Sequence, residues 1–220
     1  MNSLFFGTGY NTFLKRVMDI VLASILLVIF SPVCFLVSIA IKLDSEGPIF
    51  ADVPERVGQN GALFKMYKFR SMIKNAHVLL HTDSRFKSLF ERYQKDSYKL
   101  KDDPRVTSVG KWIRKHSIDE IPQLLNVLLG EMSIVGPRAY YPDELENQQK
   151  KHPDTKKFVN DVLSVKPGIT GLWQVSGRSE VHFDKRIALD AEYIKSISLL
   201  EDVRIMFKTP LVMITGRGAV

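Results

Sequence analysis

The sequence has a single cysteine, Cys34, and no concentrated run of lysine and arginine. One cysteine excludes an intramolecular disulfide and a zinc site built from clustered cysteines. The lack of a basic, aromatic-rich motif argues against a nucleic-acid partner. What is present is a diffuse excess of positive charge, with 31 Lys and Arg against 24 Asp and Glu in 220 residues. The net charge of +7 suits anionic partners such as acidic lipids or phosphorylated substrates.

One stretch, residues 17 to 41, is almost entirely apolar, and its only formal charge is Asp19. The stretch is too long for a signal peptide, and no small-residue cleavage site follows it. As a straight helix it would measure about 37 Å at ~1.5 Å per residue. That length exceeds the roughly 30 Å hydrocarbon thickness of a bilayer, so the stretch is predicted to enter a membrane.

Two features bear on whether this stretch spans the bilayer or turns back. Pro32, directly after Ser31, removes a helix hydrogen bond near the middle and bends the helix axis. Lys15 and Arg16 precede the stretch and Lys42 follows it, which favours both ends on the cytoplasmic face. A re-entrant helix and an ordinary kinked transmembrane helix fit these residues equally well.

Beyond residue 43 the composition becomes that of a soluble domain. Residues 63–72 alternate apolar and basic side chains, which predicts a strand. Its cations, Lys65, Lys68 and Arg70, form either a solvated face or a cationic wall. The tail, residues 203–214, is either an interfacial amphipathic helix or a core helix. Further helices are predicted over most of residues 74–101, 143–152, 154–164 and 180–200.

The middle of the chain holds the strongest candidate for chemistry, the adjacent carboxylates Asp119 and Glu120 beside a predicted helix start. Ser117 to Glu120 fits a capping box. A helix that begins at Ile121 or Pro122 fits equally. In both cases the positive helix end and nearby cations favour the ionised carboxylate, a usable nucleophile and a hard oxygen ligand for Mg²⁺. Taken in isolation, these residues are explained more simply by helix capping.

Three arginines, Arg114, Arg138 and Arg178, each lie beside a helix start or a Gly/Pro turn. Arginine binds phosphate in a bidentate manner, and such turns expose backbone N–H groups to anions. Together with the paired carboxylates, they favour phosphoryl transfer assisted by Mg²⁺. His77 and His81 stand four residues apart, as helical metal ligands do. Because no third ligand is evident, we interpret them as a surface pair.

Five segments occur in a characteristic order: KRVMDI, the apolar stretch with Ser31-Pro32, FKMYKFRSM, DPRVTSVGKWIRKHSIDEIPQLLNVLLGEMSIVGPR and KPGITGLWQVSGR. From about Leu14 to Lys208 they make the sequence resemble the monotopic phosphoglycosyl transferases. These bacterial sugar transferases begin polysaccharide, exopolysaccharide and glycoconjugate assembly on a lipid carrier. The long central segment is the most specific part of the likeness.

The resemblance implies an α/β fold that is helix-rich with a small sheet. It implies an N-terminal re-entrant membrane helix broken at Ser31-Pro32 within residues 1–43, followed by a cytoplasmic, membrane-associated catalytic domain with interfacial amphipathic helices, residues 44–220. The expected location is the cytoplasmic face of the bacterial inner membrane, in contact with its lipid. The chain is similar to the small, single-domain members. The identity of the sugar, the residues that read it and the formation of a homodimer stay open.

The resemblance also implies a reaction and a set of roles. Asp119 is expected to attack the sugar-bearing phosphate of a UDP-sugar and release UMP. The resulting aspartyl-phosphosugar is then expected to pass to undecaprenyl phosphate. Asp119 and Glu120 are expected to hold a required Mg²⁺. The expected substrate-binding residues are Arg114, Pro137, Arg138, Gly177 and Arg178.

Two other functions stay open on the residues alone. The first is a glycosyltransferase that cleaves the sugar C1–O bond and releases UDP instead of UMP. The second is a non-catalytic membrane-associated scaffold, in which Asp119 and Glu120 cap a helix and the arginines bind lipid head groups. The nucleotide released from a UDP-sugar separates all three functions.

Overall fold

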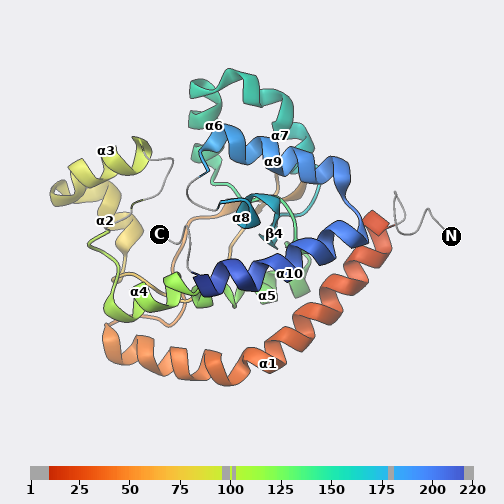
Figure 1. The fold of residues 1–220 in the computed structure, drawn as a ribbon. Coiled ribbons are helices and arrows are strands. Elements are labelled where there is room, and N and C mark those ends of the chain that lie inside the picture. The colour runs from red at the N-terminus through yellow and green to blue at the C-terminus, as the bar shows by residue number, and fades with distance from the viewer. Residues whose placement is uncertain (1–9, 96–99, 101–102, 178–180, 216–220) are drawn as a thin grey trace.

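The computed structural model describes residues 10–95, 100, 103–177 and 181–215. Within these ranges the fold is helix-rich with two small sheets, which confirms the predicted fold class (Figure 1). The helices are α1 (Lys15–Asp44), α2 (Ala76–Thr82), α3 (Lys87–Lys95), α4 (Ser108–Lys115), α5 (Gln123–Leu129), α6 (Pro142–Lys151), α7 (Lys156–Leu163), α8 (Leu172–Val175), α9 (Phe183–Ser196) and α10 (Leu199–Thr215). Shorter helical turns are η1 (Tyr10–Leu14), η2 (Gln59–Gly61), η3 (Ser84–Phe86), η4 (Ile118–Glu120) and η5 (Pro153–Thr155).

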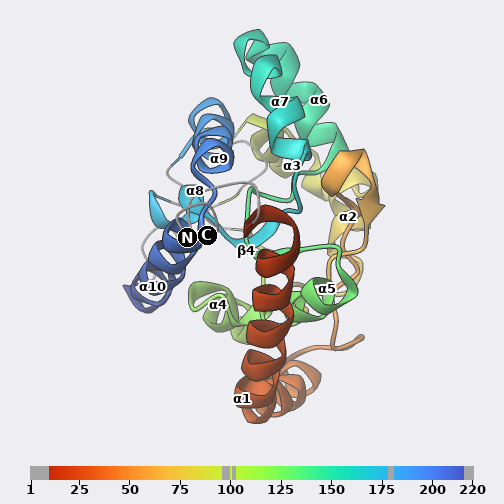
Figure 2. The same ribbon diagram turned by 90° about the vertical axis from the view of Figure 1, so that its right-hand side faces the viewer.

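The strands are short and form two separate pairs. β1 (Arg56–Val57) pairs antiparallel with β2 (Leu63–Phe64). β3 (Ser133–Val135) pairs parallel with β4 (Gly168–Thr170). The β3–β4 pair lies against α1, α5 and α10 and brings the two Gly/Pro-rich segments together. Both views show α6 and α7 on the side of the molecule opposite α1 (Figures 1 and 2).

The N-terminal end of α1 is held by polar contacts with the domain that follows. The Arg16 guanidinium donates hydrogen bonds to the carbonyl oxygens of Val127 and Leu128, at 2.6 and 3.0 Å. These carbonyls lie at the end of α5, where helix carbonyls lack intrahelical donors. Buried Asp19 accepts a hydrogen bond from the Ser133 hydroxyl at 2.8 Å. The only acidic residue of the apolar stretch therefore joins α1 to β3.

The C-terminal end of α1 packs against the same domain. Ile41 is buried in an apolar cluster that includes Phe69 and Ile113. The backbone N–H of Val109 donates to Asp44 Oδ2 at 3.3 Å. Burial of apolar side chains contributes about 1.5–3 kcal/mol each, so this end is held mainly by packing. Both ends of α1 are thus fixed to one domain.

The middle of α1 projects away from that domain. Val28 and Phe35 are 74% and 67% exposed. The helix is continuous across Ser31-Pro32, and it bends near the middle of its length (Figure 1). The predicted break is therefore a bend within one helix. Pro32 cannot donate to the carbonyl of Val28, and the Ser31 hydroxyl donates to that carbonyl instead, at 2.8 Å. The side-chain hydrogen bond thus replaces the backbone bond that Pro32 cannot make, and the helix continues.

Among the described residues, α1 is a helix long and apolar enough to cross a membrane. Its 30 residues would reach about 45 Å at ~1.5 Å each if straight. The structure confirms an apolar N-terminal helix with an exposed, lipid-compatible middle. Whether that helix turns back within the bilayer stays a prediction.

Three predicted elements differ from the structure. The helical stretch expected over most of residues 74–101 is divided into α2 and α3, with an extended Asp83 and the turn η3 between them. The expected strand over residues 63–72 is a strand only at Leu63–Phe64. Further along, Arg70 N donates to Ile49 O and Ala51 N donates to Lys68 O, both at 2.8 Å, and these two bonds form an isolated antiparallel bridge between Phe50 and Phe69. Met72 forms a second isolated antiparallel bridge, with Val106, so within the described ranges this part of the segment pairs at single bridges and not in a continuous ladder.

The helix expected over residues 180–200 is divided between α9 and α10. Ile197 has an extended backbone, with φ −50° and ψ 118°. The Ser198 hydroxyl accepts a hydrogen bond from the Glu201 N–H at 3.2 Å and so starts α10. In α10, Ile205 is buried in the core whereas Phe207 is 77% exposed. The helix therefore has both a core face and an exposed apolar face, and its contact with a bilayer stays a prediction.

Candidate active site

The carboxylates of Asp119 and Glu120 converge on one ammonium group. Lys68 Nζ lies 3.0 Å from Asp119 Oδ2 and 3.1 Å from Glu120 Oε1. The backbone N–H of Phe69 donates to the Asp119 carbonyl at 3.0 Å, which holds the extended Lys68 segment against η4. Asp119 is only 3% exposed, whereas Glu120 and Lys68 are half-buried. The site is therefore an ion triplet at the protein surface with one buried carboxylate.

The predicted capping box at Ser117 is wrong. Ser117 has a left-handed backbone, with φ 55°, and its side chain makes no helix-capping hydrogen bond. The left-handed residue turns the chain between α4 and η4, so its hydroxyl does not lie over the first helical N–H groups. Thr107 caps α4 instead, accepting from Gly110 N at 3.0 Å. α5 begins directly after Pro122, close to the alternative start at Ile121 or Pro122.

Burial and the oppositely charged neighbours act against each other on the pKa values of Asp119 and Lys68. Desolvation by burial raises the pKa of Asp119, while the Lys68 charge lowers it and the Glu120 charge raises it. The more distant Arg114 also lowers the pKa of Asp119. Burial alone would lower the pKa of Lys68, but the two carboxylates outweigh this effect and raise it. Lys68 therefore stays charged, and its charge is the largest effect that opposes the rise in the pKa of Asp119.

Only one of the three cations on residues 63–72 reaches this site. Lys65 is exposed and lies 3.4 Å from Asp52. Arg70 turns toward the loop after α1, where it donates to the carbonyls of Glu46 and Pro48 at 2.7 and 2.6 Å. The alternating pattern identified a cationic segment but did not identify Lys68 as the partner of the carboxylates. Its position depends on a contact across about fifty residues of sequence.

A second group of charges surrounds Arg138, in the loop that follows β3. Glu144 Oε1 lies 3.8 Å from Arg138 Nε and accepts a hydrogen bond from Arg186 Nη1 at 3.2 Å. Both guanidinium groups lie 5.2 Å from the centre of the Trp173 ring. Arg138 Nε is buried and has no hydrogen-bond partner within the described part of the chain. An anion beside Arg138 would supply that partner.

Asp190 holds the Arg138 loop through two hydrogen bonds. Its Oδ2 accepts hydrogen bonds from Arg138 N at 3.1 Å and from the Tyr140 hydroxyl at 2.9 Å. Asp190 is fully buried, and burial raises its pKa to about 7, against the lowering effect of these two hydrogen bonds. No local pattern identified this residue, because it lies on α9 more than fifty residues after Arg138 in the chain.

The two charge groups belong to one electrostatic environment. Burial would lower the pKa of Arg138, but Glu144, Glu120 and the tyrosines that directly follow Ala139, Tyr140 and Tyr141, together raise it. Glu120 therefore interacts both with Lys68 and, through space, with Arg138. The carboxylate pair and the Arg138 loop, predicted as separate parts of one site, lie within electrostatic range of each other.

Backbone contacts join the two Gly/Pro-rich segments beside this site. Gly168 N donates to the Pro137 carbonyl at 2.8 Å. A Cβ added at Gly168 would lie 2.1 Å from Gly136 N, so only glycine allows this approach. Gly177 ends the second segment with φ 146°. Arg178 lies outside the described residues, so its predicted role is not tested.

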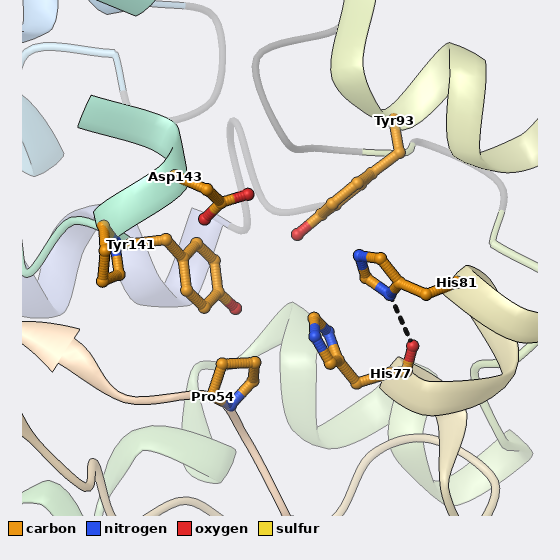
Figure 3. A pocket seen from close by; sticks show the side chains of 7 residues that line it. Pro54, His77, His81, Tyr93, Tyr141 and Asp143 are labelled. Carbon is orange, nitrogen blue, oxygen red and sulfur yellow. Dashed lines mark hydrogen bonds between the residues drawn. The ribbon is translucent and has the colours of Figure 1, made fainter. Parts of the chain in front are cut away.

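A pocket of about 230 Å³ lies between α2, α3 and the start of α6 (Figure 3). His77 and His81, interpreted from the sequence as a surface pair, line its wall with ring centres 4.4 Å apart. Within the described ranges, no group of three or more His, Cys, Asp or Glu side chains is arranged to hold a metal. The remaining lining residues are Pro54, Tyr93, Tyr141, Pro142 and Asp143.

The family model described as "Bacterial sugar transferase" matches residues 10–216. The chain is similar to an "Undecaprenyl-phosphate galactose phosphotransferase" of Salmonella typhimurium, with 42% identity over 212 residues, 95% of this chain and 42% of the relative. It is 43% identical to "Exopolysaccharide production protein ExoY" of Sinorhizobium fredii over 207 residues, 93% of this chain and 87% of the relative.

A third relative is the "UDP-glucose:undecaprenyl-phosphate glucose-1-phosphate transferase" of Escherichia coli. It is 37% identical over 214 residues, 92% of this chain and 40% of the relative. The chain thus spans less than half the length of the Salmonella and Escherichia relatives, and most of the length of ExoY.

Proposed function

Because this chain belongs to the bacterial sugar transferase family, we propose that it moves a sugar 1-phosphate from a UDP-sugar to undecaprenyl phosphate. The names of the Salmonella and Escherichia relatives support this reaction class. The observation that carries the proposal is the buried Asp119 carboxylate, held by Lys68 beside Glu120. The reaction would be the first membrane step of polysaccharide, exopolysaccharide or glycoconjugate synthesis.

In the first step, a carboxylate oxygen of Asp119 attacks the sugar-bearing phosphorus of the UDP-sugar. A bond forms between Asp119 and that phosphorus, and the bond from the phosphorus to the bridging oxygen breaks. The electron pair stays on the bridging oxygen, and UMP leaves. Burial supports this role because desolvation raises the pKa of Asp119 and makes its carboxylate more basic, while the Lys68 charge favours the ionised form.

In the second step, a phosphate oxygen of undecaprenyl phosphate attacks the phosphorus of the aspartyl-phosphosugar. The bond from the phosphorus to Asp119 breaks, and the carboxylate is restored. The product is an undecaprenyl diphosphate sugar. Asp119 thus carries the phosphosugar between a soluble donor and a lipid acceptor, and no further reactant is needed.

The surrounding charges suit a diphosphate substrate. Charge builds on the leaving oxygen during phosphoryl transfer, and fixed cations nearby stabilise it. Arg138 is supported as a phosphate contact by its partly unpaired guanidinium within the described ranges. Arg114 acts on Asp119 through space. Glu120 neutralises part of the charge on Lys68 and completes the carboxylate pair.

Asp119 and Glu120 would hold the Mg²⁺ expected for this reaction. Mg²⁺ in phosphate sites is bound by one or two carboxylates plus phosphate oxygens and water. The two side chains fit this donor set, because their oxygens already converge on one cation, Lys68 Nζ. When bound, the ion would neutralise charge on the phosphate oxygens.

The attachment of α1 supports a re-entrant position in the membrane. Arg16 and Asp44, at opposite ends of the helix, both contact the same domain, and the exposed apolar side chains lie between them. A helix tied at both ends to one soluble domain keeps both ends on one side of the bilayer. Exposed apolar residues Trp112 on α4 and Phe207 on α10 support further contact with the lipid surface. We place the domain on the cytoplasmic face of the inner membrane.

The released nucleotide tests the proposed reaction. The purified chain, in detergent or nanodiscs, is mixed with a panel of UDP-sugars, undecaprenyl phosphate and Mg²⁺. UMP is the expected product, and chelation of Mg²⁺ should abolish its release. Asp119→Asn should lower turnover by about 10³-fold or more, whereas Asp154→Asn, an exposed matched control, should keep it. Release of UDP would indicate a glycosyltransferase, and no nucleotide from any sugar would favour a scaffold.

A further inference from the structure

The pocket between α2, α3 and α6 is distinct from the ion triplet and has its own lining. Figure 3 shows the Tyr93 and Tyr141 hydroxyls, the two histidine rings and the Asp143 carboxylate facing the same space. Its volume of about 230 Å³ is below the ~300–1,000 Å³ of sites for drug-sized ligands. A single ring therefore fits it better than a whole nucleotide sugar.

The lining has many hydrogen-bonding groups but no lysine or arginine. Tyrosine hydroxyls both donate and accept, and the Asp143 carboxylate accepts. His81 Nδ1 lies 2.8 Å from the His77 carbonyl, and a carbonyl only accepts, so Nδ1 donates. In the neutral ring, Nε2 of His81 is then an acceptor. This mixture suits an uncharged ligand with several hydroxyl groups and does not suit a phosphate.

Arg56 joins the pocket residue Tyr141 to the loop that holds Arg138. The Arg56 guanidinium carbon lies 3.2 Å from the centre of the Tyr141 ring. The same guanidinium donates to the carbonyl of Ala139, next to Arg138, at 3.1 Å. Tyr141 and Asp143 follow Arg138 within five residues of sequence. A ligand with a phosphate at Arg138 could therefore place an attached ring in the pocket.

We propose that this pocket reads the hexose of the nucleotide sugar, with Asp143 and Tyr93 bonding its hydroxyl groups. This inference rests on the proposed function and assigns part of its specificity. A pyranose presents hydroxyl groups around its edge and C–H groups on its faces. Tyr141, Pro54 and Pro142 supply apolar surface for those faces, and the polar groups surround the edge.

The uracil ring is the competing occupant, since it is also uncharged. A flat base is bound best between parallel aromatic surfaces. The His77 and His81 rings are tilted by 48° to each other, so they do not form such a slot. The hexose also explains why both donors and acceptors line a small space, because epimers differ only in the direction of one hydroxyl.

Binding measurements with two variants test the pocket independently of turnover. Affinities for UDP alone and for a panel of UDP-hexoses are measured by calorimetry with the native chain, Asp143→Asn and Tyr93→Phe. Loss of one hydrogen bond to a carboxylate lowers affinity by about 10- to 100-fold. We expect Asp143→Asn to lower affinity for the best-bound UDP-hexose by at least about 10-fold and to reduce discrimination between epimers. UDP affinity should change by less than about twofold.

Asp154→Asn is the matched control, an exposed aspartate in the turn before α7, and it should leave all affinities unchanged. Equal losses for UDP and UDP-hexose in Asp143→Asn would assign the pocket to the nucleotide and overturn the proposal. Unchanged epimer discrimination in both pocket variants would also overturn it. Failure of the proposed reaction is distinguishable, because it appears as absent UMP release by the native chain and not as a change in these affinities.

Discussion

Lys68 Nζ lies between two carboxylates, 3.0 Å from Asp119 Oδ2 and 3.1 Å from Glu120 Oε1. The ammonium group partly offsets the cost of burying Asp119, because its charge lowers the pKa of Asp119 whereas desolvation raises it. In the proposed reaction only the ionised carboxylate attacks phosphorus. In the proposed mechanism, the Lys68 charge would therefore lower the pH at which the Asp119 carboxylate becomes available.

Replacement of Lys68 should shift the pH profile of the reaction. Because the Lys68 charge lowers the pKa of Asp119, Lys68→Gln removes that effect and the pKa rises further. The acid limb of kcat/KM for UMP release should then move to higher pH, and the rate at neutral pH should fall. Lys68→Arg keeps the charge and should retain much of the native profile. An acid limb that stays in place in Lys68→Gln would refute this role.

Arg138 should contribute to substrate binding through its planar guanidinium. Lysine keeps the charge but cannot bind phosphate in a bidentate manner. We expect Arg138→Lys to lower kcat/KM by about 10-fold or more, since a charge-assisted hydrogen bond contributes about 1.5–3 kcal/mol. Thermal unfolding of the variant shows whether the packing around Glu144 survives. Arg204→Lys, on the exposed side of α10, is the matched control, and an equal effect there would exclude a specific role for Arg138.

Asp190 should make stability depend on pH. Its pKa is about 7 in the fold and about 3.9 in an unfolded chain. Between these values the native state binds the additional proton, so the free energy of unfolding decreases as pH rises from about 4 to 7 and levels off above 7. The decrease is at most about 4 kcal/mol. In denaturant unfolding, the free energy of unfolding of Asp190→Asn should lack this part of the pH dependence. If the free energies of unfolding of the variant and the native chain differed by the same amount at every pH, the prediction would be contradicted.

The two ends of α1 should be accessible from one side of the membrane. Phe13→Cys and Glu46→Cys place labels beside the two ends of the helix, in a Cys34→Ala background that removes the native thiol. In sealed inner-membrane vesicles of known orientation, an impermeant maleimide should reach both labels only from the cytoplasmic side. Reaction of the two labels from opposite sides would establish a transmembrane span instead.

The sequence was sufficient to predict those parts of the site that are close in the chain. Asp119 and Glu120 are adjacent, and Pro137 and Arg138 follow in the same segment. Their residue types and turn positions were visible without a structure. Most helical segments were also predictable, although the divisions within residues 74–101 and 180–200 were not. The bend at Pro32 followed from the missing N–H, although Ser31 keeps the helix continuous there.

Contacts between distant segments could not be predicted in this way. Lys68 reaches Asp119 because Phe69 N bonds the Asp119 carbonyl, and no local pattern specifies that bond. His77 on α2 and Tyr141 before α6 line the same pocket although they lie far apart in the sequence. The capping box failed for a related reason, since the left-handed backbone of Ser117 is set by the chain on both sides.

A trapped covalent intermediate tests the proposed mechanism most directly. The chain is incubated with Mg²⁺ and a UDP-sugar labelled in the sugar, without undecaprenyl phosphate, and the quenched protein is analysed by peptide mass spectrometry. The mechanism predicts a sugar phosphate on the peptide containing Asp119, release of an equal amount of UMP, and no adduct in Asp119→Asn. An Asp119→Asn chain that still carries the sugar phosphate at the native level, or a native chain that turns over without any adduct and releases UDP, would contradict it.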